Sequence, residues 1–343
     1  MKAWKASAPD NVVLEHHPAQ QVGPGQVKLK MLASAIGDTE LMMYQGKFGM
    51  KKFPIILGRQ GVGMVSEVGE GVTTLKRGDR VYVRPQTYCG ECSKCTSGRE
   101  NECEHVRIYG KTIDGLLCDF VIVPADNLYK LPDRVSNDEA VFLELIALAK
   151  NTIDTLGVGG GKYIIVSGAS CLGLLIAQTA IYYQAIPIVV DVNEERLAIA
   201  EKLGIYYTVN VGTEDFRKKI FAITGGKLAD AAVYTLPAVL PVQRLFDAVM
   251  TGGKAMVTAI ESTEREINVN LSFILEKNVT LGMISSVGVN VPAAINMLIS
   301  SNIKVQPFIS KCPFEEVDEY LEKCSFDPLQ YMFLIVSYDQ KKL

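Results

Sequence analysis

Residues 163–173 read YIIVSGASCLG, and an apolar segment continues from Leu174 to Tyr183. The first half is typical of a strand buried on both faces, and the second half suits a buried helix. Backbone N–H groups at the N-terminus of such a helix bind anions, and the helix dipole strengthens this binding. The stretch therefore predicts a strand, a glycine turn and a helix that together hold a pyrophosphate group.

The turn departs from the G-x-G-x-x-G pattern at one position, because Ser170 stands in place of the middle glycine. Asp191 lies 23 residues after Gly168, where an acid accepts hydrogen bonds from ribose hydroxyls and repels a 2′-phosphate. We therefore predict NAD(H) rather than NADP(H) as the cofactor, and a plain turn that binds nothing is the alternative. The candidate cofactor-binding residues are Gly168, Ser170, Cys171, Leu172, Gly173, Asp191 and Arg196.

After Gly157, nearly continuous apolar runs alternate with helical segments. This alternation is typical of parallel strands covered by helices on both faces, so we predict an α/β, doubly wound domain at residues 151–289. The predicted strands are residues 163–166, 186–190, 207–211, 231–235, 255–259 and 279–284.

The N-terminal part of the chain has a different pattern. Short alternating runs before Pro132 predict half-buried strands of a barrel or a sandwich. Ser136 and Glu139 have the spacing of a capping box, which predicts the start of a helix. A last segment, Pro292 to Asp339, is expected to return to this domain, which gives a β-rich domain at residues 1–150 and 290–343.

Composition narrows the classes of partner and compartment. The 343 residues are 48% hydrophobic with a formal charge of −3 and no basic stripe, so nucleic acid and membrane are not expected partners. The N-terminus lacks an apolar secretory segment. Glycine and polar residues interrupt the apolar stretch from Tyr163 to Tyr183, which disfavours a membrane span. We expect a cytoplasmic protein that acts on a small-molecule substrate as a homodimer or homotetramer.

Four of the eight cysteines crowd together as Cys89-x2-Cys92-x2-Cys95-x7-Cys103. Four thiolates complete the tetrahedral coordination of Zn²⁺ and leave no open position, so we predict one structural zinc in a lobe at about residues 86–106. An iron–sulfur cluster of the bacterial ferredoxin type needs its fourth cysteine after x3 with proline following, and the gap here is x7. Four thiols that bind no metal are the other alternative.

The order of these features resembles the medium-chain zinc alcohol dehydrogenases along nearly the whole chain. The resemblance implies a co-chaperonin-like β-barrel catalytic domain, a Rossmann domain and a hydride-transfer site. It rests on the four cysteines together with residues 39–41, 44–46, 57–58, 68–72, 78–81, 124–126 and 191–197, and on Gly61 and Gly63.

The same resemblance implies a second, catalytic zinc, but its ligand positions read Gly37, Arg59 and Glu144 here. Glycine offers no side-chain ligand, and Arg59 carries a permanent positive charge. Only three histidines occur in the chain, and none is expected near this site. We therefore predict that the catalytic zinc is absent and that Arg59 forms an ion pair with Glu144 or Asp38.

Three hypotheses remain for the chemistry. Arg59 replaces the metal as the group that stabilises an oxyanion or binds an anionic substrate, with Thr39 passing a proton. Alternatively, an activated enone or iminium substrate needs only orientation and a proton donor, Thr39 or Tyr44. In the third, catalysis is lost and the chain is a binding or partner subunit. Arg59 is otherwise a structural plug, and Thr39 otherwise an N-cap for the helix Glu40 to Gln45.

Overall fold

The computed structural model describes residues 1–18, 20–47, 49–50, 52–236, 239–258, 269–284, 290–300, 302–327 and 331–338. The chain forms two compact units, which are Met1–Glu144 with Phe308–Leu343 and Leu145–Pro307. These boundaries differ from the predicted ones after residues 150 and 289. The segment before residue 308 stays in the second unit, where the Gln178 side chain bonds both the N–H and the C=O of Lys304, at 2.8 and 3.1 Å.

The second unit is built on a six-stranded, all-parallel sheet with the order β13-β12-β11-β14-β15-β16. This is the 3-2-1-4-5-6 order of a doubly wound dinucleotide-binding fold. All six predicted strands are confirmed, except that Ala259 lies outside the described residues. They are β11 (Tyr163–Ser167), β12 (Ile186–Asp191), β13 (Tyr207–Asn210), β14 (Ala229–Tyr234), β15 (Val249–Thr258) and β16 (Thr280–Ile284).

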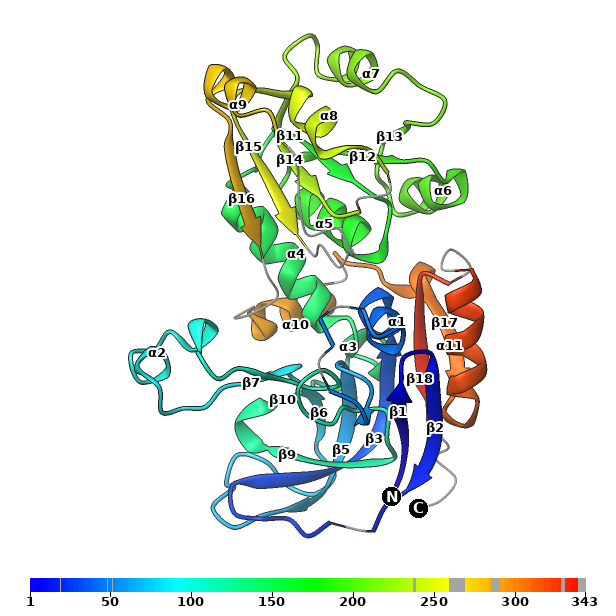
Figure 1. Ribbon diagram of the computed structural model, residues 1–343. Coiled ribbons are helices and arrows are strands. Elements are labelled where there is room, and N and C mark those ends of the chain that lie inside the picture. The colour runs from blue at the N-terminus through cyan, green and yellow to red at the C-terminus, as the bar shows by residue number, and fades with distance from the viewer. Residues whose placement is uncertain are drawn as a thin grey trace. The chain divides into compact units, whose positions relative to one another are not determined.

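Helices flank this sheet (Figure 1). The predicted apolar helix is α5, and its residues Cys171 to Ala180 are all buried. Such complete burial explains why this helix shows no polar stripe in the sequence. The helices of the unit are α4 (Leu143–Leu156), which starts at the end of the first unit, α5 (Cys171–Tyr182), α6 (Glu194–Lys202), α7 (Phe216–Ile223), α8 (Val242–Asp247), α9 (Leu271–Lys277) and α10 (Val291–Ile299).

The first unit is β-rich, with a principal sheet ordered β10-β6-β5-β3-β18-β17 and β9 also paired with β3. The late strand β18 runs antiparallel to β3 and parallel to β17, so part of the C-terminal segment returns to this unit as predicted. The strands are β1 (Lys2–Ala8), β2 (Asn11–His16), β3 (Gln26–Ile36), β4 (Ile55–Ile56), β5 (Gly61–Val68), β6 (Arg80–Val83), β7 (Gln86–Thr87), β8 (Arg107–Ile108), β9 (Phe120–Pro124), β10 (Leu128–Lys130), β17 (Ile309–Pro313) and β18 (Phe333–Ser337).

Two helix starts in this unit test the capping predictions. Ser136 caps α3 (Asn137–Ala140), and its hydroxyl accepts the Glu139 N–H, so the predicted capping box is confirmed. The predicted N-cap at Thr39 is wrong, because α1 (Asp38–Tyr44) begins two residues earlier than expected and has Gly37 as its N-cap. Glu40 supplies the capping side chain and accepts the Gly37 N–H at 3.0 Å. The remaining helices are α2 (Ser93–Thr96) and α11 (Val317–Phe326).

None of the helices in the described part of the chain is long and apolar enough to cross a bilayer. The apolar stretch from Tyr163 to Tyr183 is instead divided between β11 and α5, with the turn at Gly168 separating them. The prediction of a strand–turn–helix unit is thereby confirmed.

The turn between β11 and α5 leaves no room for a side chain at Gly173, because a Cβ there would lie 1.9 Å from the Gly168 carbonyl oxygen. We predict that Gly173→Ala lowers the free energy of unfolding by about 1–3 kcal/mol, since the turn must shift. Gly160→Ala is the matched control, because no atom lies within 4 Å of its added Cβ. Urea denaturation of both variants measures the difference, and equal stabilities would contradict the close approach.

Candidate functional site

The four clustered cysteines converge as predicted. Their sulfur atoms lie within 4.8 Å of one another, and Cys89 Sγ lies 3.8 Å from Cys95 Sγ and 3.6 Å from Cys103 Sγ. Tetrahedral zinc with Zn–S bonds of about 2.3 Å requires sulfur atoms about 3.8 Å apart. The donor set and its spacing therefore fit a closed, four-thiolate zinc site, and this is the one cluster of potential metal ligands found among the described residues.

Backbone N–H groups are directed at the sulfur atoms. Those of Cys89 and Cys92 donate to the Sγ atoms of Cys103 and Cys89, each at 3.4 Å. Hydrogen bonds from the Cys95 and Glu104 backbones lower the pKa of the Cys92 thiol to about 6, whereas desolvation raises the pKa of Cys95 to about 12. Four thiolates this close repel one another, so a dication at their centre is what allows all of them to ionise.

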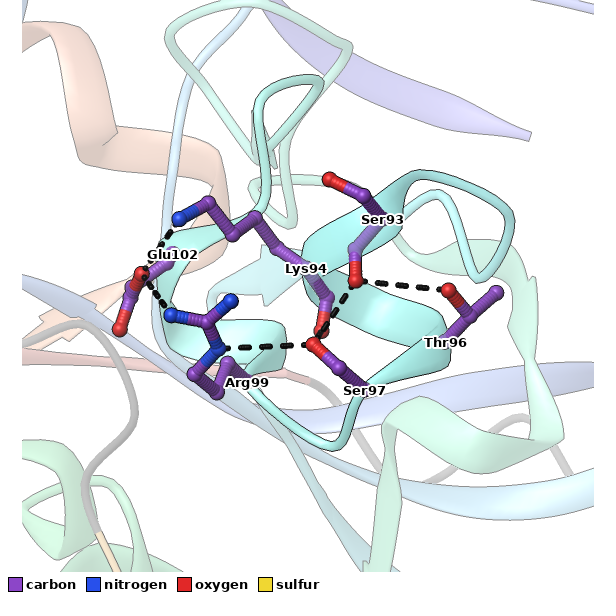
Figure 2. Close-up of polar contacts among 6 residues, drawn as sticks. All are labelled: Ser93, Lys94, Thr96, Ser97, Arg99 and Glu102. Carbon is purple, nitrogen blue, oxygen red and sulfur yellow. Dashed lines mark hydrogen bonds and ion pairs between the residues drawn. The ribbon is translucent and has the colours of Figure 1, made fainter.

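The lobe around these cysteines has little else to stabilise it. Between residues 88 and 108, Cys95 and Cys103 are the only buried positions. Figure 2 shows Lys94 and Arg99 both reaching Glu102, at 3.1 and 3.4 Å, on the surface of this lobe. Exposed pairs of this kind contribute less than about 1 kcal/mol each. Without an apolar core, the lobe is expected to depend on a metal held by its cysteines.

The predicted cofactor residues come together at the turn before α5. Gly168 adopts a φ of +111°, Ser170 is the N-cap, and Cys171, Leu172 and Gly173 form the first helical turn. The Ser170 hydroxyl accepts the Gly173 N–H at 3.2 Å. The substitution of the middle glycine thus gives the helix its own cap, which uses one of the N–H groups that a pyrophosphate would bind.

The Asp191 carboxylate, which the sequence predicts to bind a ribose, also accepts hydrogen bonds from three backbone N–H groups of the protein itself. One carboxylate oxygen accepts the Ala169 N–H at 2.6 Å, and the other accepts those of Val192 and Asn193 at 2.7 and 2.9 Å. Asp191 therefore holds the phosphate-binding turn against the end of β12. A carboxylate accepts about four hydrogen bonds, so one acceptor position remains for a ribose hydroxyl.

Arg196 lies in the first turn of α6, close along the chain to Asp191. Its Nε atom is buried and has no hydrogen-bond partner among the described residues. Buried polar atoms of this kind are usually satisfied by a ligand or an ordered water. A dinucleotide fits this arrangement. The turn at Gly168 and the N-terminus of α5 suit its pyrophosphate, and Asp191 and the unsatisfied Arg196 Nε suit its ribose end.

A second polar group, which we call the Arg59 cluster, lies inside the β-rich unit and consists of Glu40, Arg59, Gln60, Tyr82, Gln86 and Glu144. The Arg59 and Glu144 side chains are 7% and 1% exposed, and Arg59 Nη2 lies 2.7 Å from Glu144 Oε1. Gln60 Nε2 donates to Glu144 Oε2 at 2.6 Å, and Gln86 Nε2 donates to Glu144 Oε1 at 3.2 Å. The predicted Arg59–Glu144 pair is confirmed.

Several atoms of the Arg59 cluster lack a partner among the described residues. They are Glu40 Oε1, Gln60 Oε1 and the Tyr82 hydroxyl, all fully buried. Burial raises the pKa of Tyr82 well above its usual value, and the Glu144 carboxylate adds to that rise. Three unsatisfied polar atoms in one buried cluster indicate a site that water or a ligand completes.

The sequence did not point to three members of this cluster as site residues. Gln86 lies on β7 and Tyr82 on β6, and only the tertiary fold brings them near Glu144. No local sequence pattern therefore identifies them as site residues. Glu40 had a local signal, because it lies three residues after Gly37 at capping-box spacing. Thr39 lies in the first turn of α1 and is half-buried, and its proposed role in proton transfer stays a prediction.

Comparison with known proteins agrees with both units. Residues 23–133 match the alcohol dehydrogenase GroES-like domain, and residues 171–313 match the zinc-binding dehydrogenase family. An uncharacterized zinc-type alcohol dehydrogenase-like protein of Haemophilus influenzae is 31% identical over 97% of each chain. The chain belongs to the medium-chain dehydrogenase/reductase superfamily. The resemblance and the two predicted folds are therefore confirmed.

Two further relatives place this dehydrogenase/reductase among oxidoreductases. An L-threonine 3-dehydrogenase of Pyrococcus horikoshii is 31% identical over 76% of this chain and 75% of its own. An Escherichia coli oxidoreductase/dehydrogenase of unknown specificity has a TM-score of 0.92, 25% identity and 99% coverage of both chains. The chain is accordingly an oxidoreductase of the medium-chain type.

We predict one zinc per chain, bound by the four clustered cysteines. Cys103→Ser should remove it and lower the free energy of unfolding by about 3 kcal/mol or more, because the lobe has no other core. Cys324→Ser, at a buried thiol of α11 outside the lobe, is the control that should keep the metal. Elemental analysis and thermal denaturation check this, and two zinc ions per chain or unchanged stability would contradict it.

Proposed function

We propose that the chain is an NAD(H)-dependent oxidoreductase that works without a catalytic zinc. Its substrate is a small carbonyl or alcohol, or an activated double bond. The observation that carries the proposal is the engagement of Glu144, whose two oxygens accept three hydrogen bonds from Arg59, Gln60 and Gln86. A carboxylate held in this way by a cation and two amides is a poor ligand for a second cation.

The other two positions that correspond to zinc ligands support the same conclusion. Gly37 has no side chain to coordinate a metal, and Arg59 brings a charge that cannot be removed at working pH. Zn²⁺ beside this guanidinium would be repelled at short range. The residues present therefore do not fit a catalytic zinc ion, and the chemistry must come from other groups.

Arg59 is the residue that we propose stabilises the negative charge that develops on the substrate oxygen during hydride transfer. A guanidinium carries five N–H donors in a fixed plane, and this shape suits an oxyanion, a carboxylate or a phosphate. Fixed donors of this kind stabilise an oxyanion without reorganisation, which lowers the barrier to hydride transfer. Thr39, in the first turn of α1, is the proposed hydroxyl that passes the proton.

A dinucleotide is held by the turn at Gly168 and the N-terminus of α5, with Asp191 and Arg196 at the ribose end. When bound, its nicotinamide supplies or accepts the hydride. Asp191 favours NAD(H), because its remaining acceptor position suits a ribose hydroxyl and its charge repels a 2′-phosphate.

A second candidate function is a catalytically inactive subunit that keeps the dehydrogenase fold. The observation that favours it is the Ser170 hydroxyl, which already accepts the Gly173 N–H at the helix end where a pyrophosphate would bind. A ligand must compete with this internal cap, and strong competition would leave the turn unable to bind nucleotide.

Fluorescence titration with NADH and NADPH tests the cofactor. We expect NADH to bind at least about tenfold more tightly, and Asp191→Ser to narrow this ratio to a few-fold, since the lost charged acceptor is worth roughly 1.5–3 kcal/mol. The ratio is the readout, because Asp191 also supports the turn and its loss weakens both affinities.

Asp230→Ser is the matched control for that experiment. Asp230 also accepts a backbone N–H, that of Tyr163 at 2.8 Å, and its substitution should leave the ratio unchanged. Equal affinities in the wild type would show that Asp191 does not face the ribose. Failure to bind either cofactor, with binding restored by Ser170→Gly, would favour the inactive subunit.

Steady-state kinetics test Arg59. Arg59→Lys keeps the charge and loses the planar donor group, so we expect turnover to fall by about 10²- to 10³-fold, as when an oxyanion donor is removed. Arg80→Lys is the control, because Arg80 bonds Asn137 and the backbones of Pro132 and Val135, none of which belongs to the Arg59 cluster. Unchanged turnover in Arg59→Met, although that variant leaves Glu144 buried without its charge partner, would show that Arg59 has only a structural role.

A further inference from the structure

The Arg59 cluster contains two carboxyl groups and one guanidinium. Glu40 is 3% exposed, and Glu144 is 1% exposed. If both carboxyls were ionised, the cluster would carry a net charge of −1 in a buried environment, where an uncompensated charge is costly. One retained proton makes the cluster neutral. The question is therefore which carboxyl holds it.

Hydrogen-bond partners distinguish the two carboxyls. Glu144 accepts three side-chain donors, one of them the charged guanidinium at 2.7 Å, and such bonds favour the ionised form. Glu40 Oε2 accepts the Gly37 N–H at 3.0 Å, the backbone N–H of Glu40 itself also interacts with the carboxyl, and the Oε1 atom has no partner among the described residues. A carboxyl with neutral backbone donors and one unsatisfied oxygen is the better place for a proton.

We propose that Glu40 holds a proton in the resting protein, and that its ionisation draws Arg59 away from a substrate oxyanion by adding a second carboxylate beside it. Glu40 is thus a positioning residue, which acts through Arg59. The role in turnover rests on the proposed function, whereas the protonation state stands independently of it.

The pKa of Glu40 agrees with this assignment. Burial raises the pKa of the Glu40 carboxyl, the Arg59 guanidinium opposes part of the rise, and Glu144 adds to it. Arg59 comes from the loop between β4 and β5, and Glu144 from the start of α4. The acidic groups that α11 brings to α1, Asp318 and Glu322, act instead on Tyr44 at the far end of α1.

Strand β3 also packs against α1, and its last six residues, 31–36, contain no titratable side chain. Arg59 and Glu144 are therefore the charged groups whose fields act on Glu40. The charges of Arg59 and Glu144, together with burial, therefore determine whether stability rises or falls with pH.

The folded protein binds a proton at Glu40 that the unfolded chain has lost once the pH exceeds the ordinary value of 4.5. Stability then falls as the pH rises, until the folded-state pKa is passed. Glu40→Gln mimics the protonated carboxyl and does not titrate. The ratio of its folding equilibrium constant to that of the wild type should rise by up to about tenfold per pH unit.

Urea denaturation of both proteins, from about pH 5 to about pH 8, measures this ratio. Glu139→Gln is the matched control, because Glu139 occupies the same capping-box position in α3 but is half-exposed and accepts both the N–H and the hydroxyl of Ser136. We expect no such rise for the control. A ratio for Glu40→Gln that is flat or falls with pH would show an ionised Glu40 paired with Arg59 and overturn the proposal.

Infrared difference spectroscopy of the wild-type protein gives a second measurement that needs no variant. A protonated carboxyl band should be present at neutral pH and disappear as the pH is raised, whereas its absence at neutral pH would overturn the assignment. In turnover, the wild type should lose activity over the same pH range, and Glu40→Gln should lack that limb of the profile.

The outcomes separate the two proposals. If the protein proves to have no turnover, the stability ratio and the infrared band still decide the protonation state of Glu40. If turnover is present and the ratio does not rise, the proposed function stands and the role of Glu40 is rejected. A pH profile that is the same in wild type and Glu40→Gln would reject the coupling to Arg59.

Discussion

The contact between the Arg59 guanidinium and the Glu144 carboxylate is the interaction on which the site depends. It joins the loop after β4 to the start of α4, and Gln86 on β7 adds a third element to the same carboxylate. A buried pair of this kind adds little net stability, because the loss of hydration offsets the attraction between the charges. Loss of one partner is costly, however, since it leaves the other charge buried alone. The pair therefore constrains both residues even though it stabilises the fold weakly.

The same reasoning connects the site to the rest of the cluster. Glu144 already accepts three donors, one of them the Arg59 guanidinium, so its negative charge has a partner inside the cluster. Glu40, Gln60 and Tyr82 keep buried polar atoms without protein partners. In a close-packed interior, such atoms mark the places where water or substrate groups enter.

Much of the fold could be predicted from residue patterns with one dominant cause. The six strands of the doubly wound unit follow from apolar runs buried on both faces, and the convergence of the four cysteines follows from a spacing that few other arrangements explain. The Arg59–Glu144 pair could be predicted because a buried permanent cation requires an anion. In each case a short stretch of sequence, or a single residue, is stable only in one kind of surroundings, and this makes the structure predictable.

The remaining features depend on contacts between distant segments. Gln86 meets Glu144 from 58 residues away, and the turn at Ala169 meets Asp191 from 22 residues away. The N-cap of α1 was misplaced for a local reason. A threonine before a helix usually caps it through its own hydroxyl, but here the Glu40 side chain accepts the N–H of Gly37, which is the N-cap.

The position of β18 has a consequence for how the chain is made. This strand, from Phe333 to Ser337, lies between β3 and β17 in the principal sheet of the β-rich unit. On a ribosome, the residues of β3 emerge first and wait for a neighbour encoded some 300 residues later, while the whole of Leu145–Pro307 is synthesised in between. The doubly wound unit can complete its sheet from contiguous residues, whereas the unit that begins the chain must finish last, with the edge of β3 exposed to aggregation until then.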